Sequence, residues 1–297
     1  MSENLIHCPV CGKGGFSLFL ETRDYFLSGE PFSIRECSAC GFKFVSPRPG
    51  KTEIGPYYQS DEYISHDAKS NSLISRVYRL ARFFSIRFKF NIVRTYMDSG
   101  RILDVGCGTG EFLKYCKSKG FEVSGVEPND KARTFAQQVN AIPVRSDLSE
   151  IDSGPTGFNC ITMWHVLEHL HDLNESIELV KRQLLPDGIF VVAVPNSNSW
   201  DAQKYGKFWA AYDVPRHLYH FTKDTVNILA EKHGFEIVKI SPQKLDAFYV
   251  SMLSEKYLAG RTNYFKALFS GIWSNFQAGR QGRGHSSLIF VLSRKKA

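Results

Sequence analysis

The sequence has no apolar run long enough to cross a bilayer, and its first residues, Met1 to Pro9, hold none long enough for a signal peptide. Internal repeats and long low-complexity segments are also missing. We therefore expect a cytoplasmic protein without stable membrane insertion. The 297 residues, of which 43% are hydrophobic and 23% charged, suffice for one large core, or for one core plus a small module.

Cysteine is sparse outside the N-terminal region. Four of the seven cysteines fall in Cys8-Pro9-Val10-Cys11-Gly12 and Cys37-Ser38-Ala39-Cys40-Gly41. Each tight turn brings two thiolates within reach of one zinc ion, and the glycine permits a left-handed backbone there. Two such turns complete a site with no open position, so we predict a structural zinc ion bound by Cys8, Cys11, Cys37 and Cys40. The remaining three are expected to be buried small hydrophobic residues: Cys107, Cys116 and Cys160.

The chain reads as four consecutive regions. Residues 1–50 form the zinc ribbon-like module, 51–100 a helical lead-in, 101–240 an α/β domain, and 241–297 a helical extension with a final edge strand. Predicted strands are Arg101–Val105, Glu122–Glu127, Ile142–Arg145, Phe158–Trp164, Gly188–Val194, Phe235–Ile240 and Ser287–Leu292. Predicted helices are Glu111–Lys119, Asp130–Val139, Leu173–Leu184 and Lys223–His233. Strand alternating with helix at these lengths predicts a doubly wound, mostly parallel sheet.

The strongest chemical signal is a glycine-rich turn, Asp104-Val105-Gly106-Cys107-Gly108-Thr109-Gly110, between a predicted strand and a predicted helix. Such a turn lets the backbone approach a ligand closely and aims helix N–H groups at it. Glu127 ends the next strand, where an acid can accept hydrogen bonds from both ribose hydroxyls. The spacing is G-x-G-x-G, whereas the dinucleotide fingerprint is G-x-G-x-x-G.

This combination resembles the class I S-adenosylmethionine-dependent methyltransferases, whose first motif nearly coincides with residues 104–110. The resemblance implies a seven-stranded sheet with an antiparallel edge strand near Leu288. It also implies that Asp147 contacts adenine, although a Ser-Asp pair could equally cap the next helix. The implied cofactor-binding set is Asp104, Gly106, Cys107, Gly108, Gly110, Glu127, Asp147 and Trp164.

The fourth predicted strand runs into His165-Val166-Leu167-Glu168-His169, which is similar to a segment of a large bacterial subgroup of these enzymes. The same five residues fit the H-x-x-E-H motif of zinc peptidases. That alternative needs both histidines in one helix and a third ligand, whereas the segment begins where a buried strand ends. No cluster in the sequence suggests a catalytic metal.

A long connection from Pro195 to about Thr222 carries seven aromatic residues and the segment Arg216-His217-Leu218-Tyr219-His220. Its aromatic residues could form a lid that excludes water, or the wrapping of a small satellite core. Methyl transfer to a hydroxyl or carbon acid requires removal of a proton, and histidine suits that task near neutral pH. The candidate catalytic residues are His165, His217 and His220, and Arg216 could hold an anionic group of the substrate.

The net charge of +7 favours an anionic partner, or simply reflects solvated helix faces, above all in the basic stretch from Lys69 to Arg101. The N-terminal cysteine module resembles that of the sugar C-methyltransferases, in which it helps to enclose the substrate. We therefore expect a methyltransferase acting on a small molecule, such as a sugar, quinone-like or lipid-linked acceptor. The alternatives are methylation of RNA or protein, and a cofactor-binding protein without turnover. No feature of the sequence specifies an oligomeric state.

Overall fold

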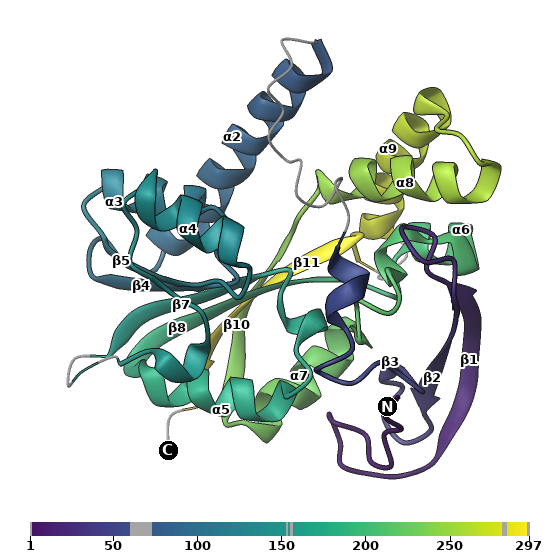
Figure 1. Cartoon of the computed structure of the whole chain (residues 1–297), viewed down its shortest axis with the longest axis horizontal. Coiled ribbons are helices and arrows are strands. Elements are labelled where there is room, and N and C mark those ends of the chain that lie inside the picture. The colour runs from purple at the N-terminus through teal and green to yellow at the C-terminus, as the bar shows by residue number, and fades with distance from the viewer. Residues whose placement is uncertain (1, 60–72, 153, 155–156, 281–283, 296–297) are drawn as a thin grey trace. The chain divides into compact units, whose positions relative to one another are not determined.

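A computed structural model describes residues 2–59, 73–152, 154, 157–280 and 284–295 (Figure 1). Its larger sheet has seven strands in the order β10-β11-β8-β7-β4-β5-β6. The strands are β4 Arg101–Val105, β5 Glu122–Val126, β6 Val144–Arg145, β7 Phe158–Trp164, β8 Leu184–Pro195, β10 Phe235–Pro242 and β11 Ser287–Arg294. All seven predicted strands are therefore confirmed, two of them with the predicted bounds and the other five with ends shifted by a few residues.

The centre of this sheet is parallel. β4 pairs in parallel with β5 on one side and with β7 on the other, and β5 pairs in parallel with β6. Ile102 and Leu103 of β4 and Ile161 of β7 are fully buried. Near-continuous apolar runs of this kind are typical of strands that are covered on both faces.

The prediction of a final edge strand near Leu288 is wrong. β11 lies between β10 and β8, and β10 occupies the edge. The first six residues of β11, Ser287–Leu292, are all buried, whereas Glu236, Lys239 and Val238 of β10 are exposed or half-buried. The uninterrupted apolar run of β11 fits an interior strand, because an edge strand needs polar residues toward solvent.

Helices follow the strands as predicted: α3 Glu111–Ser118, α4 Asp130–Gln138, α5 Leu173–Gln183 and α7 Lys223–Lys232. Figure 1 shows α3 and α4 on one face of the sheet and α5 on the other. At the head of α4 the Asn129 side chain accepts a hydrogen bond from the Ala132 N–H, and this cap defines the start of that helix. Helix α2, Leu73–Arg94, lies within the expected lead-in, and its residues Leu80 and Phe84 are exposed.

A second sheet of four strands contains the N-terminal region. Its order is β1-β2-β3-β9, with β1 Phe16–Arg23, β2 Pro31–Cys37, β3 Lys43–Val45 and β9 Tyr219–His220. In the register of β3 and β9, Phe44 lies opposite Tyr219. The cysteine module is thus completed by a strand from the long connection, a pairing between segments about 175 residues apart in the chain that local sequence patterns do not reveal.

The long connection is ordered rather than a bare loop. It contains α6, Trp200–Tyr205, two 3-10 turns and β9. Tyr205, Trp209 and Tyr212 are buried in one apolar cluster with Ile34 and Val45 of the second sheet. These three aromatic side chains form a satellite core, the second of the two alternatives considered from the sequence.

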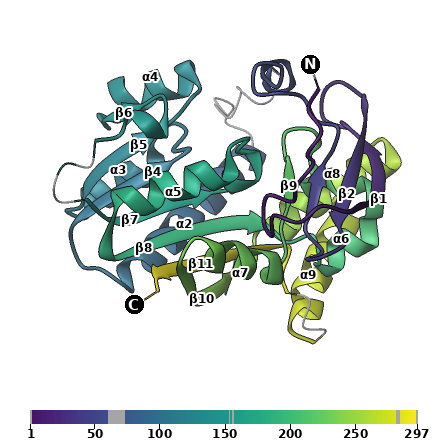
Figure 2. The same ribbon diagram turned by 90° about the horizontal axis from the view of Figure 1, so that it is seen from below.

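Two further helices, α8 Asp246–Ala259 and α9 Tyr264–Arg280, follow β10. They lie side by side (Figures 1 and 2). By its contacts the chain forms two units: 1–63, 167–173 and 193–290 make one, and 64–166, 174–192 and 291–297 the other. These units cut across the four consecutive regions expected from the sequence. In the part of the chain that the structure describes, none of the helices has the length and apolarity needed to cross a bilayer.

Candidate functional site

The glycine turn that follows β4 packs closely against Val126, at the end of β5, and against Val166. The N–H groups of Gly106 and Cys107 both donate to the Val126 carbonyl oxygen, at 2.7 and 3.0 Å. A Cβ atom on Gly106 would lie 2.4 Å from the Val166 side chain, so no larger residue fits there. A Cβ atom on Gly108 would have no heavy atom within 4 Å. The turn is therefore closed toward the protein at Gly106 and open at Gly108, where a ligand can approach the backbone.

Glu127 stands beside this opening, where the sequence placed it. One carboxylate oxygen accepts a hydrogen bond from the Gly108 N–H at 2.8 Å, and the other accepts from the Asn129 N–H at 2.9 Å. The side chain is buried, and that burial raises the pKa of its carboxyl above the ordinary value. Each oxygen of a carboxylate can accept two hydrogen bonds, so the braced carboxylate keeps acceptor capacity for ligand hydroxyls.

Asp104 lies deeper, at the end of β4. Its carboxyl accepts a hydrogen bond from the Thr162 hydroxyl at 2.5 Å. Complete burial raises the pKa of Asp104 to about 7, although the Thr162 hydrogen bond and the charge of Lys89 act in the opposite direction. Asp104 is thus a buried acid whose charge is only partly compensated, a state typical of functional sites.

Trp164 ends β7 and is buried. Its ring meets Phe112 edge-on at 5.6 Å between centroids, and the Lys89 ammonium lies 4.8 Å from the ring centroid. The indole N–H is buried, and among the described residues it has no hydrogen-bond partner. A buried donor without a partner is costly, so this N–H is suited to a ligand acceptor.

Two further predicted cofactor contacts, Cys107 and Asp147, differ in character. Cys107 is buried, and its sulfur atom would lie 2.6 Å from a Cβ atom on Gly125, so its side chain points into the protein and any ligand contact comes from its backbone. Asp147 is exposed and caps the 3-10 turn Leu148–Glu150 by accepting a hydrogen bond from the Ser149 N–H at 2.8 Å. The capping role considered from the sequence is therefore present.

His165 has a left-handed backbone, with φ of 58°. It follows β7 directly, and the residues after it form the short 3-10 turn Leu167–His169 rather than a helix. Left-handed backbone at a residue other than glycine is uncommon and concentrates at functional sites. The zinc-peptidase alternative required His165 and His169 in one continuous helix, and this local structure does not provide one.

The other two candidate bases lie in the first unit. His220 is almost fully buried, and burial lowers its pKa well below the ordinary value. Its Nε2 atom is buried without a hydrogen-bond partner in the described part of the chain. His217 is half-buried, and its Nδ1 lies 2.8 Å from the Ala211 carbonyl oxygen. A carbonyl oxygen only accepts, so Nδ1 carries the proton and Nε2 keeps the lone pair that a base needs.

In the structure, the side chains of His169 and Glu168 lie close to His217. One ligand atom from each of the three lies within 4.8 Å of the others. The His169 Nδ1 is 2.9 Å from the Arg216 carbonyl oxygen, and burial together with the charge of His217 lowers the pKa of His169 to about 4. Two imidazoles and one carboxylate are a donor set that divalent cations accept. Folding thus brings His217 to a motif that lies 48 residues earlier in the chain, a grouping that spacing along the sequence does not reveal.

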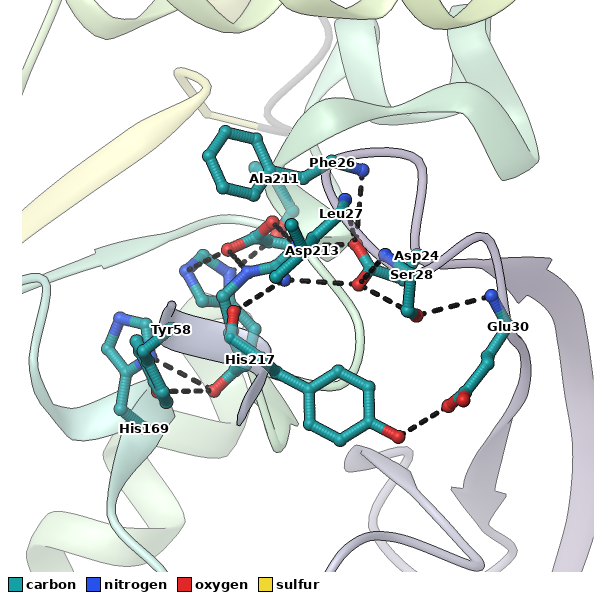
Figure 3. Close-up of polar contacts among 12 residues, drawn as sticks. Asp24, Phe26, Leu27, Ser28, Glu30, Tyr58, His169, Ala211, Asp213 and His217 are labelled. Atoms are coloured by element: carbon teal, nitrogen blue, oxygen red, sulfur yellow. Dashed lines mark hydrogen bonds and ion pairs between the residues drawn. The ribbon is translucent and has the colours of Figure 1, made fainter. Parts of the chain in front are cut away.

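Arg216 is the centre of a buried ionic cluster with Asp24 and Asp213, two acidic residues that are labelled in Figure 3. Its guanidinium donates to both oxygens of Asp24, to both oxygens of Asp213 and to the Tyr57 carbonyl oxygen, at 2.7 to 3.2 Å. These bonds use all its N–H groups. Burial would raise the pKa of Asp24, but hydrogen bonds from Arg216 and Ser28 outweigh burial and lower it. Since partners within the described residues take every donor, the expectation that Arg216 holds a substrate anion is wrong.

The four N-terminal cysteines meet in space. The sulfur atoms of Cys8 and Cys40 are 3.7 Å apart, those of Cys11 and Cys37 are 3.6 Å apart, and all four lie within 4.8 Å of one another. The following glycines, Gly12 and Gly41, have φ of 74° and 70°, which confirms the left-handed turns predicted there. Tetrahedral zinc with bonds of 2.3 Å to sulfur separates its ligands by about 3.8 Å, so the cluster fits a zinc ion.

The fold and the glycine turn together define a class of protein. The sequence profile of a methyltransferase domain family matches residues 79–240, more than half of the chain. The chain therefore belongs to this family.

Two relatives match about a third of the chain. YqeM of Bacillus subtilis (strain 168), to which a methyltransferase role is ascribed, is 34% identical over 113 residues, which are 34% of this chain and 44% of YqeM. A ubiquinone biosynthesis O-methyltransferase of Caulobacter sp. (strain K31) is 30% identical over 110 residues, 35% of this chain and 44% of the relative. The chain thus spans less than half the length of these relatives.

A solved structure extends the likeness to the fold. The magnesium protoporphyrin IX methyltransferase of Synechocystis PCC 6803 superposes with a TM-score of 0.54 at 12% identity, covering 83% of this chain and all of that one. At this identity the likeness concerns the fold alone. The chain has the class I methyltransferase fold, built on a mostly parallel sheet of seven strands.

Proposed function

We propose that this protein is an S-adenosylmethionine-dependent methyltransferase acting on a small molecule. The observation that carries the proposal is the glycine turn, open at Gly108, with the braced Glu127 carboxylate beside it. The match of residues 79–240 to a methyltransferase domain supports it. When bound, S-adenosylmethionine supplies an electrophilic methyl group for in-line displacement.

The cofactor-binding roles follow from the site. The backbone of Gly106, Cys107, Gly108 and Gly110 would face the methionine part, and Glu127 would accept hydrogen bonds from the ribose hydroxyls. Asp147 would contact adenine with the carboxylate that caps its turn, and the Trp164 N–H would find its acceptor in the ligand. Asp104 would act indirectly, by holding the end of β4 through Thr162.

The acceptor that we propose is a sugar, quinone-like or lipid-linked molecule, methylated at oxygen or carbon. One supporting observation is the similarity to a ubiquinone biosynthesis O-methyltransferase. Another is that described basic residues of the 69–101 stretch are engaged locally, since Arg82 pairs with Glu111 at 3.1 Å and Arg94 with Asp98 at 3.2 Å. A surface that binds RNA would instead present unpaired basic groups to phosphates.

Among the three candidate histidines we favour His217 as the group that takes the acceptor's proton. Its tautomer leaves Nε2 as an acceptor, and Asp213 Oδ2 lies 4.0 Å from that nitrogen, where it stabilises the imidazolium that proton uptake creates. His220 is held in its neutral form by burial. His165 stays a candidate on account of its left-handed backbone.

We further propose that Cys8, Cys11, Cys37 and Cys40 hold a structural zinc ion. The sulfur geometry fits the metal, and four thiolates leave no open position for catalysis. Metal binding would then contribute to the folding of the second sheet, because Cys37 ends β2.

Transfer of an isotopically labelled methyl group tests this function. The protein is incubated with labelled S-adenosylmethionine and with the small-molecule, RNA and protein fractions of a bacterial extract, each supplied separately. We expect label in the small-molecule fraction alone, and a loss of roughly a hundredfold in rate for His217→Ala with unchanged cofactor affinity. His233→Ala, a buried histidine outside the proposed site, is the control. Label in RNA or protein would favour the alternative acceptors, and no transfer to any fraction would favour a binding protein.

A further inference from the structure

Helix α9 has its small side chains inside and its large ones outside. The residues that it buries are Ala267, Ser270, Gly271, Ser274 and Ala278. This face packs against α8 and α6. At Gly271 an added Cβ atom would lie 2.5 Å from the Phe248 ring, and the Ser274 hydroxyl donates to the buried Asp201 at 2.8 Å. Close packing therefore accounts for the small residues on the inner face.

Packing does not account for the opposite side. There, seven large apolar side chains, which we term the aromatic face of α9, are exposed by 37 to 88%: Tyr264, Phe265, Leu268, Phe269, Ile272, Trp273 and Phe276. Phe269 stacks on Trp273 at 6.0 Å between ring centroids, yet both rings remain exposed. A contiguous apolar surface of this kind is rare on a protein that meets only water, and it marks an interaction site.

The segment of sequence that carries this face has charge of one sign. From Lys256 to the end of the chain there are eight lysine and arginine residues and not one aspartate or glutamate. Four of the basic residues are exposed on or beside α9: Lys256, Arg261, Lys266 and Arg280. The Arg280 guanidinium lies 5.3 Å from the Phe276 ring centroid, so basic and aromatic groups share one surface.

This charge decides among possible occupants. Two copies of the chain joined through this face would bring basic groups against basic groups without an acidic partner. An anionic lipid surface satisfies both features, because aromatic rings settle at the level of the headgroups while lysine and arginine reach the phosphates. A helix of 17 residues, about 26 Å long, can lie in the plane of such a surface. We propose that the aromatic face of α9 docks on an anionic lipid bilayer.

Cosedimentation with vesicles tests the proposal. The full-length protein is mixed with vesicles of phosphatidylcholine alone, or of phosphatidylcholine with phosphatidylglycerol. We expect binding to the anionic vesicles to be stronger by about tenfold or more, and to weaken as salt is raised. Phe265→Ser combined with Phe269→Ser should reduce that binding by about tenfold or more, because two apolar anchors are lost. Both side chains are exposed, so circular dichroism should show an unchanged fold.

A matched control replaces exposed apolar residues elsewhere. Leu18 on β1 and Val238 on β10 are exposed by 52 and 49%, and Leu18→Ser with Val238→Ser should leave vesicle binding unchanged. Equal binding to neutral and anionic vesicles would overturn the proposal, as would an equal loss in both double variants. A dimer in solution that Phe265→Ser with Phe269→Ser abolishes, together with no vesicle binding, would assign the face to a second copy instead.

Discussion

The chain buries acidic residues in two places, and the pKa values of their carboxyl groups shift in opposite directions there. Beside the glycine turn, burial raises the pKa of Glu127 and brings that of Asp104 to about 7, with few groups to compensate their charge. Around Arg216, two carboxylates receive four hydrogen bonds from one guanidinium, and the pKa of Asp24 falls below its ordinary value.

This difference distinguishes the proposed binding site at the glycine turn from the ionic cluster of Arg216, which acts as a scaffold that holds segments of the chain together. A fully compensated buried charge holds segments together, as Arg216 does for the loop at Asp24 and the turn at Asp213. Partly compensated acids, together with the unpartnered Trp164 N–H in the described structure, leave interactions for a ligand to complete.

The largest effect is expected at the cysteine cluster, to which we assign a structural role like that of the Arg216 cluster. Cys37→Ser should remove one zinc ion per chain and unfold the second sheet, because structural zinc contributes about 10 kcal/mol or more in small domains. Elemental analysis and circular dichroism measure both effects. Cys116→Ala, which alters a buried thiol outside the cluster, should retain the zinc. A wild-type protein free of zinc after purification without chelators would contradict this assignment.

Next in size is Arg216→Met. Loss of the guanidinium leaves two buried or half-buried carboxylates without compensation, so the free energy of unfolding should fall by about 3–5 kcal/mol. Arg216→Lys should recover only part of the loss, since one ammonium cannot replace the planar fork. Urea unfolding measures both, with the exposed Arg261→Met as control. A loss below about 1 kcal/mol would show that the cluster is not a scaffold.

Asp104 should make the free energy of unfolding depend on pH in the direction opposite to Asp24, because the pKa of Asp104 is raised and that of Asp24 is lowered. Its folded pKa of about 7 lies above the ordinary 3.8, so between these values the folded state binds the extra proton and stability falls as pH rises. Asp104→Asn keeps an acceptor for Thr162 and cannot ionise. In the wild type, the free energy of unfolding should fall by about 2 kcal/mol between pH 5 and pH 8 through this residue. In Asp104→Asn this fall should be absent. If the free energy of unfolding changes with pH equally in the variant and the wild type across that range, this account is contradicted.

The smallest effect is expected at Asp147. Asparagine caps as well as aspartate, so Asp147→Asn should change the free energy of unfolding by less than about 0.5 kcal/mol and preserve cofactor affinity. Asp147→Ala removes the acceptor and should weaken binding of S-adenosylhomocysteine by roughly threefold to tenfold. Titration calorimetry on both variants measures this. Unchanged affinity in Asp147→Ala would reduce the residue to its capping role.

The central sheet could be predicted from the sequence because its signals are local. Arg101–Val105 and Phe158–Trp164 are strands with the predicted bounds, and Glu127 stands beside the glycine turn as its spacing indicated. The position of β11 was missed, although its unbroken apolar run carried a signal for an interior strand. Spacing along the chain also placed the four cysteines correctly, since each pair occupies one turn.

What the sequence could not provide are contacts between distant segments. The β3–β9 pairing, the burial of Trp209 and Tyr212 under the second sheet, and the meeting of His169 with His217 all join parts of the chain that no local pattern connects. Arg216 is the clearest case. A basic residue in an aromatic segment resembled a substrate contact, and only the position of Asp24, almost 200 residues earlier, identifies it as a structural ion pair.

The most direct test of the account is calorimetric binding of S-adenosylhomocysteine, with NAD as comparator. We expect one binding site for S-adenosylhomocysteine, none for NAD, and an affinity at least about tenfold lower in Glu127→Ala. Glu122→Ala, at an exposed acid that begins β5, the strand directly before Glu127, is the matched control and should bind as the wild type does. Binding of NAD alone, or equal affinity in Glu127→Ala and wild type, would contradict the cofactor site.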